Sequence, residues 1–120
     1  MVPGSSPGRF TNFMSKKQLH KELRKRFNEE VFKRDRHKCI ICGSTEKLDA
    51  HHITDRKEMP NGGYVLSNGA TLCEIHHWSA EQFHINGGKA WLKGFHPSEL
   101  YLLINSSYEQ AHEDSIKSGT

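Results

Sequence analysis

The sequence is poor in apolar residues and contains no run of them long enough to span a membrane. Only 34% of its 120 residues are hydrophobic, and its N-terminus lacks the charged start and apolar middle of a secretory signal. The cysteines number three, so they cannot all pair in disulfides. These absences argue against membrane and disulfide-stabilised secreted proteins. They predict one small cytoplasmic domain that needs a bound metal to fold.

Positive charge is concentrated at the N-terminal end. Residues 1–38 contain 11 Lys and Arg against 4 Asp and Glu, whereas residues 39–120 contain 6 against 10. Such a basic segment is typical of contact with nucleic acid, and we expect Lys21, Arg24, Lys25 and Arg26 to contribute. The alternative is a solvated helix face that only confers solubility.

Hydrophobic periodicity predicts a helix in this basic segment. Leu19, Leu23, Phe27 and Val31 fall four residues apart, which places them along one side of a helix that begins near Ser15.

Further along the chain, short apolar stretches at 47–53 and 70–72 are typical of strands, and helical patterns return at 73–83 and after Pro97. The expected segments are a flexible leader or cloning-derived sequence over 1–13, a basic amphipathic helix over 14–38, a core over 39–85, a helical region over 86–112 and a frayed polar tail over 113–120. The aromatic residues expected in the core are Trp78, Phe83 and Trp91.

Two short pairs of residues predict a zinc site. Cys39-x2-Cys42 is followed directly by Gly43, and Cys73-x2-His76 lies further along the chain. Two such pairs bring four ligands into the tetrahedron that zinc prefers. Isolated cysteines are more often small buried hydrophobes, but paired spacing favours a structural zinc ion.

Four further motif residues lie at fixed positions relative to these pairs. The adjacent histidines His51 and His52 end the first expected strand, Asn68 precedes the second, and His77 follows the last zinc ligand. Their order with the cysteine pairs resembles the His-Asn-His (HNH) endonucleases over residues 39–77. The resemblance implies an α+β fold, in which a ββα-metal finger is braced by the structural zinc and flanked by N- and C-terminal helices.

The resemblance also implies roles for these residues. His51 and His77 would bind a catalytic divalent metal, His52 would be the general base, and Asn68 would orient the loop that carries the base. The implied substrate is DNA in a bacterial or phage-infected cell, with 5′-phosphate and 3′-hydroxyl products. Neutral imidazole accepts a proton from water near physiological pH, and a cation stabilises the charge that develops on the phosphate. The residue types accept Mg²⁺, Mn²⁺, Ni²⁺ or Zn²⁺.

Two weaker assignments complete the expected site. Arg56 could clamp a phosphate oxygen, although a loop arginine is as often only solvated. Glu81 is expected as the third metal ligand, because it lies one turn beyond His77, whereas His84 lies about 10 Å along the helix axis from His77. His84 is therefore expected to be structural.

Two other classes of protein remain as alternatives. A zinc-knuckle module that binds DNA without catalysis would keep the zinc site and the basic helix, but it would not need His51, His52, Asn68 and His77. An adaptor of RING type would need a second complete set of zinc ligands, and only one set is visible.

Overall fold

The computed structural model describes residues 15–119, so the expected leader over 1–13 lies outside the described residues. The elements, in chain order, are α2 (Lys16–Arg34), β1 (Leu48–His52), the short 3-10 turns η2 (Arg56–Glu58), η3 (Pro60–Gly63) and η4 (Leu66–Asn68), β2 (Gly69–Cys73), α3 (Glu74–Ile85), α4 (Pro97–Leu103) and α5 (Tyr108–Ser118). Among these, no helix is both long and apolar enough to cross a membrane.

The central unit is a β-hairpin followed by a helix. β1 and β2 pair antiparallel, with Leu48 opposite Cys73 and His52 opposite Gly69. α3 follows β2 directly and contacts both strands. This β1–β2–α3 unit, with helices before and after it, confirms the expected α+β fold class with a ββα finger.

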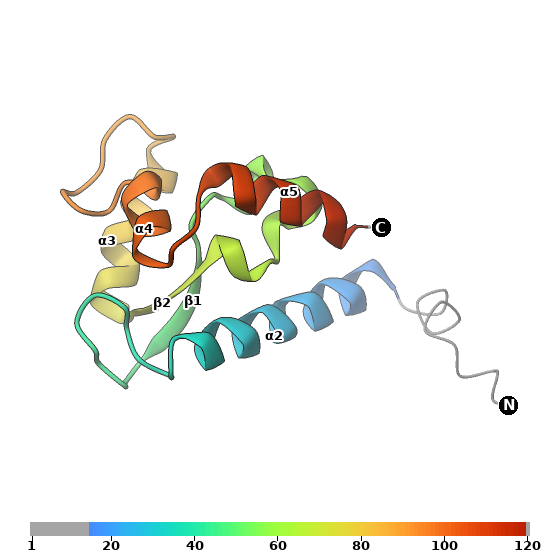
Figure 1. Ribbon diagram of the computed structural model, residues 1–120, viewed down its shortest axis with the longest axis horizontal. Coiled ribbons are helices and arrows are strands. Elements are labelled where there is room, and N and C mark those ends of the chain that lie inside the picture. Colours follow the sequence, from blue (N-terminus) through green and yellow to red (C-terminus); the bar gives the residue numbers. More distant parts are fainter. Residues whose placement is uncertain (1–14, 120) are drawn as a thin grey trace, which may run out of the picture.

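The C-terminal half of helix α2 packs on one face of the hairpin. Ser15 caps the helix through a reciprocal capping box with Gln18. Phe27 and Val31 are buried against the strands, whereas Leu19, at the other end of the expected apolar stripe, is 37% exposed. The N-terminal part of α2 therefore projects beyond the hairpin (Figure 1).

Gly69 explains how α2 comes so close to β2. A Cβ atom at this position would collide with the side chains of Phe27 and Val31. Arg34, at the end of α2, also donates hydrogen bonds to the carbonyls of Leu66 and Gly69. A larger residue at position 69 would push the helix off the strand.

The C-terminal helices pack on the other side and form the larger core with the strands. This core contains Ile53, Leu72 and Leu100, each no more than 1% exposed. α5 contacts η3 and η4 (Figure 1), and Asn61 donates a hydrogen bond to the carbonyl of Ser115.

Two expectations about the C-terminal half are wrong. The tail from residue 113 is not frayed, because α5 continues to Ser118 and Ser115 is fully buried. Trp78 and Trp91 are not core residues either, since they are 62% and 47% exposed. The inward face of α3 is filled by Ser79 and Ala80 instead.

Candidate functional site

Cys39, Cys42, Cys73 and His76 lie together and form a donor cluster that could hold a metal ion. The Cys42 and Cys73 sulfurs are 3.8 Å apart, and the Nδ1 atom of His76 lies 3.6 Å from the Cys39 sulfur and 3.3 Å from the Cys73 sulfur. Bonds of about 2.3 Å to sulfur and about 2.0–2.1 Å to nitrogen would separate tetrahedral ligands by about 3.8 Å and about 3.6 Å, respectively. The cluster therefore has the dimensions of a Cys3His zinc site.

The local backbone brings this cluster together. The Gly43 amide donates to the Cys39 carbonyl, and Gly43 has a φ of 77°, which closes the turn between the first two ligands. Burial opposes ionisation of Cys39, but hydrogen bonds to backbone groups of Cys42, Cys73 and Ile41 outweigh it and lower the pKa of this thiol to about 6. The thiolate, which is the form that binds zinc, is thereby favoured.

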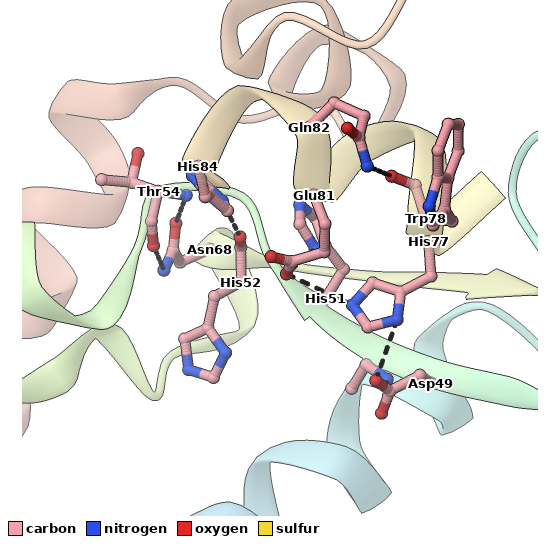
Figure 2. Close-up of polar contacts among 11 residues, drawn as sticks. Asp49, His51, His52, Thr54, Asn68, His77, Trp78, Glu81, Gln82 and His84 are labelled. Carbon is pink, nitrogen blue, oxygen red and sulfur yellow. Dashed lines mark hydrogen bonds and ion pairs between the residues drawn. The ribbon is translucent and has the colours of Figure 1, made fainter. Parts of the chain in front are cut away.

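Strand β1 separates the two adjacent histidines by pointing them to opposite faces of the hairpin. The His51 ring faces α3, where it contacts the His77 and His84 rings at centroid distances of 5.3 Å each. The His52 ring faces α2, where it stacks on Phe27 at 4.3 Å. Two neighbouring residues of one type therefore occupy different environments (Figure 2).

His51 is 1% exposed, and neither of its ring nitrogens has a hydrogen-bond partner among the described residues. Its Nδ1 atom lies 3.4 Å from Oε1 of Glu81, which is an electrostatic contact without hydrogen-bond geometry. Burial lowers the pKa of His51, so the ring is held neutral with a free lone pair. A buried imidazole of this kind, beside a carboxylate, fits a metal ligand.

Glu81 lies between His51 and His77. Its Oε1 atom is 3.3 Å from Nε2 of His77, and the contacts with His51 and His77 hold the pKa of Glu81 well below its usual range. The Nδ1 atom of His77 lies 3.2 Å from Oδ2 of Asp49 (Figure 2). Both ring nitrogens of His77 thus face carboxylates. These contacts, and the one with Glu81 most of all, raise the pKa of His77.

The compact donor group at this site consists of His51, Glu81 and His84, whose ligand atoms all lie within 4.8 Å of one another. Nε2 of His84 is 3.0 Å from the carbonyl oxygen of His52 (Figure 2). A carbonyl only accepts, so Nε2 carries a proton in this contact, and Nδ1 is the nitrogen that could bind a metal ion. The structure therefore places His84, expected to be structural, in the compact donor group, while His77, an expected ligand, lies outside it.

The ring of His52 is enclosed by aromatic side chains. It stacks on Phe27 and meets the edge of Tyr64 at a centroid distance of 5.1 Å, and its Nε2 atom has no hydrogen-bond partner within residues 15–119. Burial, followed by the positive charge of Arg56, lowers the pKa of His52 to about 4. The ring is therefore neutral at physiological pH and able to accept a proton.

Asn68 fixes the loop that follows β1. Its side-chain oxygen accepts hydrogen bonds from the Thr54 amide and the Tyr101 hydroxyl, and its amide group donates to the carbonyls of Thr54 and Gly63. The Tyr101 hydroxyl also lies 2.7 Å from Oγ1 of Thr54. Asn68 is fully buried, and its hydrogen bonds connect the segments that carry Thr54 and Gly63.

Several of the candidate site residues border a cleft of about 280 Å³ that is lined by Asp49, Ala50, His52, Asp55, Arg56, His77, Glu81 and His84. Arg56 is exposed and donates to the Tyr64 hydroxyl at 3.0 Å. The basic residues of α2 that are expected to contact DNA do not all lie on one face of the helix. Because successive residues turn by about 100°, Arg24, Lys25 and Arg26 point in three directions around the helix.

The comparison with protein families supports this arrangement. Residues 39–80 match the family model described as HNH endonuclease. The expected family resemblance is confirmed for this segment. No curated protein and no solved structure matched the chain. Glu81 and His84 lie just beyond the matched segment.

Three residues of the site were not identified from the sequence. Asp49 lies within the segment that resembles the HNH endonucleases but has no role assigned from the sequence, and Tyr101 lies on a helix outside that segment. The axial distance of His84 from His77 argues against a ligand role from the sequence, but its neighbours in the compact group are Glu81 and His51. The axial rise from Glu81 to His84 is only about 4.5 Å, and this three-residue spacing is the sequence signal that places His84 beside Glu81.

Proposed function

We propose that this protein is a metal-dependent endonuclease that hydrolyses phosphodiester bonds of DNA. The observation that carries the proposal is the pair of adjacent histidines in β1. His51 is buried with unpartnered nitrogens beside Glu81 and His84, while His52 is neutral and borders the same cleft. A DNA-binding module without catalysis would not need two adjacent histidines in these two different environments.

His51, Glu81 and His84 would hold a divalent cation, and His77 would orient the Glu81 carboxylate from its outer side. The donor set fits such an ion, because two imidazoles and a carboxylate leave coordination positions open. When bound, the cation would supply charge stabilisation to the phosphate and the leaving oxygen. The second cluster, Cys39, Cys42, Cys73 and His76, would hold a structural zinc ion.

His52 would accept the proton of the attacking water through Nδ1, because its Nε2 atom is buried. Its ring is fixed between Phe27 and Tyr64, and its backbone carbonyl is held by His84. Arg56 would bind a non-bridging phosphate oxygen, since its guanidinium is fixed by Tyr64 at the edge of the cleft. Asn68 would keep the base loop in place through Thr54.

The test is incubation of supercoiled plasmid with the zinc-loaded protein and added Mg²⁺, Mn²⁺, Co²⁺, Ni²⁺ or Zn²⁺, with a chelator control. We expect nicking or linearisation with at least one cation. His52→Ala should retain its fold and both metals but lose cleavage by roughly 10² or more, the usual contribution of a positioned base. Cleavage by His52→Ala at the parental rate would contradict the assignment, and no cleavage with any cation would favour the binding-module alternative.

A further inference from the structure

A second groove lies next to the candidate catalytic cleft. It has a volume of about 560 Å³ and is lined by His20, Arg56, Lys57, Asn61, Gly62 and Tyr64. Arg56 lines both the groove and the cleft, so the two are neighbours at this residue. Its lining residues come from the N-terminal part of α2, from η2 and η3, and from Tyr64.

The charge of the groove differs from that of the cleft. The catalytic cleft contains the carboxylates of Asp49, Asp55 and Glu81, whereas the described residues that line the groove include no carboxylate. Within residues 15–119, Lys57 and His20 have no hydrogen bond or ion pair with another side chain. The cationic Lys57 ammonium group, next to a candidate site for phosphate chemistry, is complementary to a polyanion, and the His20 imidazole can donate a hydrogen bond to a phosphate oxygen.

The walls of the groove are held in place by the fold. A Cβ atom at Gly62, where φ is 83°, would lie 2.8 Å from the Tyr64 ring, so the loop is closed tightly against this ring. On its far side, the loop is tied to α5 by the hydrogen bond from Asn61 to the Ser115 carbonyl. The opposite wall, α2, is fixed by the packing of Phe27 under His52 and Tyr64.

Building on the proposed nuclease function, we propose that a nucleic-acid strand runs from the catalytic cleft into this groove, where Lys57 and His20 contact phosphates next to the one that Arg56 binds. Helix geometry selects which residues of α2 take part. Arg24 lies about 40° from His20 around the helix, whereas Lys25 and Arg26 lie about 140° and about 120° away, in opposite senses. The groove therefore uses one side of the basic helix.

The test measures DNA binding by the zinc-loaded protein in the His52→Ala background, without other added divalent cations. Lys57→Gln should flatten the plot of log affinity against log salt by about 0.9 for duplex DNA or about 0.7 for a single strand, the value for one phosphate contact. The matched control is Lys33→Gln, which removes the same charge from an exposed position of α2 about 140° from His20. The control should leave the slope unchanged.

A second measurement locates the contact. Neutral methylphosphonates are placed one at a time on either side of the cut site, and each substituted DNA is bound to the parent and to Lys57→Gln. The parent of this test, His52→Ala, should lose affinity for DNA when the methylphosphonate lies at one or two positions close to the cut. The added Lys57→Gln substitution should make binding insensitive to the methylphosphonate at one of these positions. Equal slopes for Lys57→Gln and the parent, or equal losses for both proteins at every position, would overturn the proposal. Failure of the nuclease proposal is seen separately, as absence of plasmid cleavage by the parental protein with every cation.

Discussion

The metal ligands can be distinguished by comparing His84→Ala with His77→Ala. The sequence favours His77 as a ligand, whereas the structure places His84 with His51 and Glu81 within 4.8 Å of one another. His77 contacts the outer side of Glu81 at 3.3 Å and Asp49 at 3.2 Å. It therefore occupies the position of an outer-shell partner that orients a ligand.

The expected losses follow from these positions. Removal of an outer-shell partner typically lowers metal affinity by about 10–100-fold, so we expect a loss in this range for His77→Ala. His84→Ala removes a ligand and also frees the His52 carbonyl from its 3.0 Å hydrogen bond. Its loss should exceed about 100-fold, which corresponds to more than about 2.7 kcal/mol.

The assay is calorimetric titration of Mn²⁺ or Co²⁺ into zinc-loaded protein, with the Co²⁺ absorption spectrum as a second readout of coordination. His112→Ala is the control, because this half-buried α5 histidine contacts Tyr108 and not the site. A larger loss for His77→Ala than for His84→Ala would refute the structural reasoning and restore the ligand set expected from the sequence. Both measurements report on metal binding independently of cleavage.

Three further predictions concern the frame around the site. Cys39→Ser should give a protein without a cooperative unfolding transition, since structural zinc contributes about 10–16 kcal/mol in small zinc domains; a soluble, metal-free and cooperatively folded variant would contradict the four-ligand cluster. Tyr101→Phe should lower the free energy of unfolding by about 1–3 kcal/mol in urea titrations, because it removes a buried hydrogen-bond donor to Asn68. The control is Tyr108→Phe, which should change the free energy of unfolding little because Tyr108 is 45% exposed. Deletion of residues 113–120 should destabilise the protein, since Ser115 is fully buried; an unchanged urea midpoint would show that α5 is dispensable.

The hairpin, the first turn of α3 and the four-residue donor cluster could be predicted because they depend on local signals. Paired ligand spacing, a glycine in a tight turn and short apolar stretches each act over a few residues. The segment matched by the HNH family model contains all of them. The separation of His51 from His52 also follows from strand alternation once β1 is placed.

Other features depend on tertiary contacts that the sequence pattern does not report. α5 packs through the small residues Ala111 and Ser115 and through side-chain hydrogen bonds from Asn61 and Ser67, so it shows no strong apolar stripe. The exposure of Trp78 follows from the use of the opposite face of α3 for the site and for Ala80. Tyr101 reaches Asn68 only because α4 folds back over the loop.

The alternation of β1 has a consequence for how this sequence can change over time. The proposed ligand and the proposed base are neighbouring residues that differ in which face of the strand each occupies. Gain of one residue ahead of His51 would place His51 in the position of His52, against Phe27, and loss of one residue would place His52 in the position of His51, beside Glu81. In either case only one of the two positions would still hold histidine. Point substitutions can therefore accumulate around the site, whereas single-residue insertions and deletions should be excluded from this strand and confined to the loops beyond it.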